Sequence, residues 1–181
     1  VFMANEIAHP EALSAWKWTS DSLTPLTSLD GMHSISLGGP TSVVRRASTS
    51  LTRATTTVST TLHGSDSTHS IASFSEEALV QPNVQFIRAG AKQIPCALIL
   101  PRDIQPGTKL PVLMDPYGGP HAQRVVDAYT AHCTSQWFAD QGFVVVVADN
   151  RGTPGKGVAV GRGAGMLCPY PGKFAIDGII T

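Results

Sequence analysis

The sequence has no excess of either charge, few cysteines and no long apolar run. Its 181 residues carry 13 basic and 13 acidic side chains, so no net field favours nucleic acid or an anionic membrane as a partner. No apolar run approaches the roughly 20 residues that cross a bilayer, and the N-terminus lacks the profile of a signal peptide. We therefore expect a cytoplasmic protein with no nucleic acid and no membrane among its partners.

The cysteines are too few and too irregularly spaced to stabilise the fold through disulfide bonds. Cys96, Cys133 and Cys168 are an odd number at irregular spacings, which is typical of neither a disulfide framework nor a zinc site. They predict free thiols in a reducing compartment, with no metal and no cofactor.

Residues 110–151 predict a strand, a Gly- and Pro-rich loop, a helix and a second strand, in that order. The apolar run at 112–114 is too short for a helix and is closed by a Gly- and Pro-rich loop, which predicts a buried strand. The run at 143–148 is continuous and mostly β-branched, as in a parallel strand covered on both faces. Between them, 125–141 predicts a helix, and Gly142 is placed to end it in a left-handed C-cap.

The loop after the first of these strands is where chemistry is expected. A parallel pair joined by a helix puts that loop at the carboxyl edge of the sheet, where open α/β sheets hold their ligands. Gly118 and Gly119 would let backbone N–H groups face a developing negative charge, as in the oxyanion hole of an α/β-hydrolase. The alternative is a tight turn that merely ends the strand.

Two motifs in this stretch carry a family resemblance. PVLMDPYGGPHAQRV followed by SQWFADQGFVVVVADNRGTPGKG resembles the start of the catalytic domain in the prolyl oligopeptidase family, in its dipeptidyl peptidase IV branch. The resemblance implies a serine peptidase, a hydrolase that removes X-Pro or X-Ala dipeptides from the N-termini of peptide substrates. It implies that the Tyr117 phenol donates a hydrogen bond to the oxyanion and that amides near Gly118 and Gly119 shape the substrate site. Asp149 and Arg151 would hold loops.

Residues 1–80 are β-rich pieces separated by Ser, Thr, Gly and Asp, which suits an antiparallel meander. The predicted strands are 1–3, 15–19, 33–37, 42–45, 54–61 and 70–74. Six short strands are compatible with a small sandwich or barrel, and equally with the last blade and part of another from a β-propeller. The stretch WKWTSD followed by LTPLT is similar to the blade repeat that precedes the catalytic domain in the same branch.

The whole chain thus predicts an α/β fold, the start of an α/β-hydrolase sheet preceded by antiparallel propeller blades. Residues 1–80 would be the blades, 81–157 the first part of the catalytic domain, and 158–181 a divergent Gly-rich tail. A hairpin of 84–88 and 94–100, turning at Gly90, leads into the first core strand.

The catalytic nucleophile, acid and base that the family requires are missing from this sequence. No Gly-x-Ser-x-Gly occurs, and the nearest imitation, at residues 63–66, precedes the oxyanion loop. None of the histidines matches the family's catalytic one, and His121 is expected only to hydrogen-bond near a helix start. The pair Glu76-Glu77 predicts a solvated turn. The six histidines that do not match the catalytic one are His9, His33, His63, His69, His121 and His132.

The resemblance ends near Gly157, which suggests a fragment of a longer peptidase gene with its last residues translated out of frame. Such a chain is expected to be inactive alone, and a non-catalytic binding module or a pseudogene product is the alternative. A truncated sheet is expected to leave residues 144–147 as an exposed apolar edge that promotes aggregation. The sequence does not indicate an oligomeric state.

Overall fold

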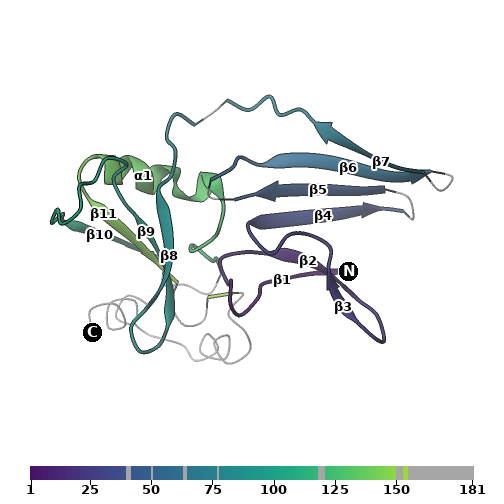
Figure 1. The fold of residues 1–181 in the computed structure, drawn as a ribbon, viewed down its shortest axis with the longest axis horizontal. Helices are drawn as coiled ribbons and strands as arrows, with labels where there is room; N and C mark the ends of the chain where they lie inside the picture. Colours follow the sequence, from purple (N-terminus) through teal and green to yellow (C-terminus); the bar gives the residue numbers. More distant parts are fainter. Residues whose placement is uncertain are drawn as a thin grey trace. The chain divides into compact units, whose positions relative to one another are not determined.

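The computed structural model describes residues 1–39, 42–49, 51–62, 65–76, 78–117, 121–149 and 153–154 (Figure 1). The chain forms two compact units. Unit 1 comprises Val1–Leu79 with Asp127–Thr130, and unit 2 comprises Val80–Val126 with Ala131–Thr181. Within the described residues, no helix is long and apolar enough to span a membrane.

Unit 1 contains a four-stranded antiparallel meander in the order β4-β5-β6-β7. The strands are β4 (Met32–Gly38), β5 (Ser42–Ser48), β6 (Thr55–Leu62) and β7 (Ser65–Ile71). Thr and Val are frequent in β5 and β6, and such side chains suit a pleated surface. A meander of this kind is the unit from which propeller blades are built, so the predicted antiparallel organisation is confirmed.

The last strand of this meander begins earlier than its sequence suggests. Leu62 pairs with Ser65, so only two residues separate β6 from β7, and β7 starts at residue 65 and not at residue 70 as predicted. The sequence does not show this start, because residues 65–70 are all polar and the side chains of Asp66–Ser70 are exposed, so the strand has no apolar alternation.

A second sheet in unit 1 has the order β1-β2-β3, all antiparallel. It consists of β1 (Phe2–Ala4), β2 (Ser14–Trp18) and β3 (Leu23–Pro25). β3 was not predicted, because it has only three residues and ends in a proline.

Gly31 connects these two sheets of unit 1 at a position where there is no space for a side chain. Its carbonyl accepts a hydrogen bond from the Leu13 amide at 3.0 Å, and its own amide donates to Asp127 Oδ2 at 2.9 Å. Its φ of +79° is left-handed, and a Cβ added there would collide with the carbonyl oxygen of Ser48. Only glycine satisfies both conditions.

We predict that Gly31→Ala lowers the free energy of unfolding by about 2–4 kcal/mol, since strain and a clash with backbone combine. Gly39→Ala is the matched control, because Gly39 also has a positive φ but nothing lies within 4 Å of its added Cβ. The control should cost about 1–2 kcal/mol. Urea unfolding followed by tryptophan fluorescence measures both, and equal losses would contradict the packing argument.

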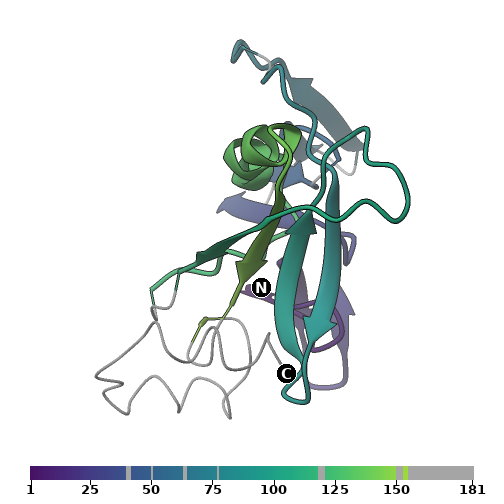
Figure 2. The ribbon, with the colours of Figure 1, turned by 90° about the vertical axis from the view of Figure 1, so that its left-hand side faces the viewer.

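Unit 2 is built on a mixed sheet in the order β10-β11-β9-β8 (Figure 2). Its strands are β8 (Val84–Ala89), β9 (Ile94–Ile99), β10 (Val112–Pro116) and β11 (Val144–Ala148). β10 and β11 are parallel, whereas β9 is antiparallel to both β8 and β11. The predicted hairpin and the predicted parallel pair are both present, and Gly90 turns the hairpin with a φ of +62°.

The position of β11 corrects the expected exposed edge. β11 lies between β10 and β9, and Val145 and Val147 are each only 1% exposed. Within the described residues, the strands at the two ends of this sheet are β10, whose Val112 is 59% exposed, and β8. The prediction was wrong because it overlooked that β9 occupies the second side of β11.

The helix of unit 2 is shorter than predicted. A 3₁₀ turn, η1 (Tyr129–His132), precedes α1 (Cys133–Asp140), so residues 125–128 are not helical. In that segment the amide of Val125 donates to a side chain, Asp149, and the amide of Asp127 donates to the Glu11 carbonyl. These bonds replace the intrahelical ladder. Gly142, with a φ of +98°, ends the helix as predicted.

The inner face of α1 is partly polar. Ala139 of α1, together with Val125 from the segment before η1, packs against Ala97, Ile99, Val145 and Val147 of the sheet. Gln136 of α1 is also fully buried. Its carbonyl oxygen accepts from the Asn83 amide at 2.6 Å, and its amide donates to the Leu100 carbonyl at 3.0 Å. Gln136 therefore satisfies backbone groups just outside β8 and β9.

The C-terminal end of α1 is held by Asp140. Arg102 donates to Asp140 Oδ2 at 2.7 Å, and Gln136 donates to Oδ1 at 2.8 Å. Desolvation raises the pKa of Asp140, but the hydrogen bonds from Gln136 and Arg102 and the charge of Arg102 lower it more, so this pKa lies below its ordinary value.

We predict that Arg102→Gln raises the pKa of Asp140. The depressed pKa contributes stability that is present above the ordinary aspartate pKa and is lost as pH falls through the folded value, so the variant should lose part of this acid dependence. A carboxyl carbon NMR titration measures the pKa directly. Lys109→Gln removes an exposed positive charge elsewhere in unit 2 and should leave it unchanged; an unshifted Asp140 in Arg102→Gln would refute the assignment.

Candidate functional site

The candidate site lies at the carboxyl ends of β10 and β11. Pro116 and Ala148 are paired in register at the ends of these parallel strands, so Tyr117 and Asp149 both follow at the same edge of the sheet. Tyr117 is 40% exposed. Gly118 and Gly119, the other predicted site residues, lie outside the described residues, as does Arg151.

Asp149 holds the far end of the loop that Tyr117 begins. It is 2% exposed, and its carboxylate accepts from the Arg124 amide at 2.8 Å and from the Val125 amide at 3.2 Å. Its own amide donates to the Pro95 carbonyl at 3.1 Å. A carboxylate at the end of β11 thereby fixes the segment that leads into α1, which is the loop-holding role expected of Asp149.

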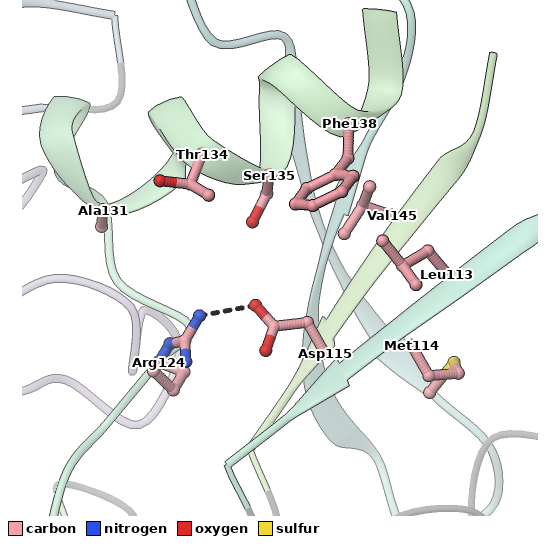
Figure 3. A pocket seen from close by; sticks show the side chains of 9 residues that line it. All are labelled: Leu113, Met114, Asp115, Arg124, Ala131, Thr134, Ser135, Phe138 and Val145. Carbon is pink, nitrogen blue, oxygen red and sulfur yellow. Dashed lines mark hydrogen bonds and ion pairs between the residues drawn. The ribbon is translucent and has the colours of Figure 1, made fainter. Parts of the chain in front are cut away.

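A second connection across the same loop was not predicted. Arg124 Nη2 donates to Asp115 Oδ2 at 2.6 Å, which links a residue near the end of β10 to the residue at the end of the loop (Figure 3). Both side chains are more than a third exposed, so the pair contributes little to global stability. The sequence signal for it is weak, namely an acidic residue inside an apolar strand.

A cavity of about 450 Å³ opens between α1 and β10, beside this ion pair (Figure 3). We call it the α1–β10 cavity. It is lined by Leu113, Met114, Asp115, Arg124, Ala131, Thr134, Ser135, Phe138 and Val145. No sequence motif indicated it, because its walls come from four separate segments.

No activated nucleophile accompanies these groups in the described part of the chain. Burial raises the pKa of the Cys133 thiol, which keeps the sulfur protonated and weakly nucleophilic. His132 is fully buried, and its Nε2 lies 2.7 Å from the Val126 carbonyl oxygen, while His121 is exposed. The described residues contain no group of His, Cys, Asp and Glu side chains that could hold a metal ion.

Two other polar residues singled out in the sequence, Glu76 and His33, belong to unit 1. Glu76 is exposed, as expected of a solvated turn, and its backbone carbonyl accepts from Arg53 at 2.7 Å. His33 is buried in unit 1, where its Nε2 lies 2.9 Å from the Asp30 carbonyl oxygen. Glu77 and His63 are outside the described residues.

Comparison with known proteins identifies what this chain is similar to. No protein-family model matches it. Dipeptidyl peptidase 8 of mouse and of human are each 40% identical to it over 63 residues, which is 34% of this chain. The crystal structure of Porphyromonas gingivalis dipeptidyl peptidase 4 matches 88% of this chain with a TM-score of 0.69 and 20% identity. The predicted resemblance to the dipeptidyl peptidase IV branch of the prolyl oligopeptidase family is confirmed.

Each match covers only a small part of the length of the similar protein. The match covers 7% of the length of each dipeptidyl peptidase 8 and 24% of the Porphyromonas gingivalis dipeptidyl peptidase 4 chain. At 20% identity, the likeness to the dipeptidyl peptidase 4 structure concerns the fold. That fold consists mostly of antiparallel sheets with few helices, as in propeller blades.

We predict that Asp149→Ala lowers the free energy of unfolding by about 2–4 kcal/mol, because it leaves two backbone N–H groups without their charged acceptor. Asp149→Asn, which keeps one acceptor oxygen, should cost less. Hydrogen exchange locates the effect: the amides of Arg124 and Val125 should accelerate more than amides inside β9. Uniform acceleration across unit 2 would mean that Asp149 acts only on global stability.

Proposed function

We propose that this chain is part of a serine-type peptidase that resembles dipeptidyl peptidases and cleaves X-Pro or X-Ala dipeptides from peptide N-termini. In this proposal unit 2 is the start of an α/β-hydrolase sheet and carries the oxyanion side of the catalytic site. Tyr117 is the oxyanion donor, and amides near Gly118 and Gly119 shape the substrate site. The nucleophilic serine, the acid and the histidine would come from sequence other than these 181 residues.

One observation carries this proposal. Tyr117 follows β10 at the edge where the parallel strand β11 also ends, and open α/β sheets bind ligands at that edge. Asp149 and the Asp115–Arg124 pair tie down the opposite end of the same loop. A phenol placed there can donate a hydrogen bond to charge that develops on a carbonyl oxygen.

A second candidate function is a non-catalytic binding module. A cavity with polar groups that no catalytic role requires favours it. The two candidates differ in whether Tyr117 has any chemical task.

We expect a fluorophosphonate probe to leave the purified chain unlabelled, with an active dipeptidyl peptidase as positive control. This follows because such probes react with activated serines and the sequence lacks the nucleophile elbow. Labelling of a serine in this chain would contradict the proposal that the nucleophile lies elsewhere.

A graft tests the role of Tyr117 itself. Residues 110–151 would replace the corresponding stretch of an active dipeptidyl peptidase, and Tyr117→Phe would be compared with the unmodified graft. We predict a fall in kcat of about 10²–10³ with KM nearly unchanged, as for loss of one oxyanion donor. Tyr129→Phe is the matched control and should retain kcat. An active graft that tolerates Tyr117→Phe would remove Tyr117 from the mechanism.

A further inference from the structure

The connection between β10 and α1 contains residues of both units. The chain belongs to unit 2 up to Val126, to unit 1 over Asp127–Thr130, and to unit 2 again from Ala131. A short piece of chain far along the sequence from Leu79 therefore completes unit 1. We call Asp127–Thr130 the inserted segment.

Hydrogen bonds hold the inserted segment within unit 1. The amide of Asp127 donates to the Glu11 carbonyl at 2.7 Å, and Asp127 Oδ2 accepts from the Gly31 amide at 2.9 Å. The amide of Tyr129 donates to Ser48 Oγ at 3.4 Å, and Tyr129 is 5% exposed. Because these partners come from the segments before β2 and β4 and from the end of β5, the inserted segment is fixed by more than one part of unit 1.

The residues just before the inserted segment are held within unit 2. The amides of Arg124 and Val125 both donate to the carboxylate of Asp149, and the Val126 carbonyl oxygen lies 2.7 Å from His132 Nε2. Val125 is also fully buried in the core of unit 2. The last of these anchored residues and the first residue anchored in unit 1 are consecutive in the chain, so a shift of one must displace the other.

Anchors on consecutive residues are expected to open together. Peptide planes are stiff and leave only two soft dihedral angles per residue, so a displacement passes to the neighbouring residues. Native proteins accordingly open locally in contiguous cooperative units. Loss of the Asp127 anchor in unit 1 should therefore loosen the Arg124 and Val125 amides in unit 2.

We propose that Asp127 is a positioning residue for the loop that begins at Tyr117. Its carboxylate holds the chain at Gly31, and through Val125 and Arg124 this anchor fixes the far end of the loop. Unit 1 thereby helps to place a loop of unit 2. The consequence for an oxyanion rests on the proposed function, whereas the coupling between the anchors does not.

Hydrogen exchange in the full chain tests the proposal with Asp127→Ala. We expect the Gly31 amide to exchange at least about tenfold faster, because it loses a charged acceptor. The Arg124 and Val125 amides should exchange about 3- to 10-fold faster, and amides inside β9 less than about twofold faster. Acceleration of Gly31 without Arg124 and Val125, or equal acceleration of all these amides and β9, would overturn the proposal.

A conservative variant separates positioning from a general loss of packing. Asp127→Asn keeps an oxygen that can accept from the Gly31 amide, so it should return the Arg124 and Val125 exchange rates to within about threefold of those of the unmodified chain. Acceleration as large as in Asp127→Ala would contradict the role of the Gly31 bond. Asp103→Ala removes an exposed carboxylate elsewhere in unit 2 and is expected to leave all of these rates unchanged.

The reverse perturbation gives a second readout. Asp149→Asn weakens the anchor in unit 2, and because coupling between two sites acts in both directions, the Gly31 amide should exchange about 2- to 5-fold faster. Unchanged exchange of Gly31 in this variant would refute the coupling. None of these rates depends on catalysis, so failure of the coupling leaves the proposed role of Tyr117 standing, and failure of that role leaves the coupling standing.

Discussion

The central position of β11 is the constraint on which the rest of unit 2 depends. This strand pairs in parallel with β10 and antiparallel with β9, and it is almost entirely buried. Parallel pairing requires a crossover between β10 and β11, so the chain must leave the sheet after Pro116, form α1, and return. The loop that begins at Tyr117 is the first part of that crossover. Its location at the carboxyl edge therefore follows from backbone topology and does not depend on any one side chain.

The topology of the sheet determines where the loop that begins at Tyr117 lies. Charged side chains then hold the far end of that loop in place. Asp149 is placed by the end of β11 and accepts from two amides at the entrance to α1. Asp115 is placed by β10 and pairs with Arg124. Because one connection is buried and the other is exposed, they act differently. The buried carboxylate stabilises the fold, whereas the exposed pair restricts the loop and lends polarity to the α1–β10 cavity.

Periodicity and turn chemistry were sufficient to predict most strands, because apolar runs closed by glycine or proline leave few alternatives. The parallel pair, the hairpin at Gly90 and the helix end at Gly142 were all predicted on this basis. β3 and the start of β7 were not, since one is very short and the other is polar throughout. These strands form because neighbouring strands supply backbone partners, and that information is not local.

The site was predictable only in part for the same reason. The position of Tyr117 after a strand, and the loop-holding role of Asp149, followed from the order of elements and from the family resemblance. The direction of Ser135 depends on how α1 packs on the sheet, and the Asp115–Arg124 pair depends on the path of the chain between β10 and η1. The sequence predicted a helix at 125–141, but it did not reveal that Ser135 and Gln136 are buried while Trp137 remains 53% exposed.

The most direct test of the account is the coding DNA downstream of the Gly155 codon, read through several hundred bases in all frames. If this chain is part of a serine peptidase, that DNA should encode Gly-x-Ser-x-Gly, followed by an aspartate and a histidine in the order of an α/β-hydrolase triad. A continuous reading frame that encodes none of these would contradict the proposed peptidase and leave the chain as a binding module.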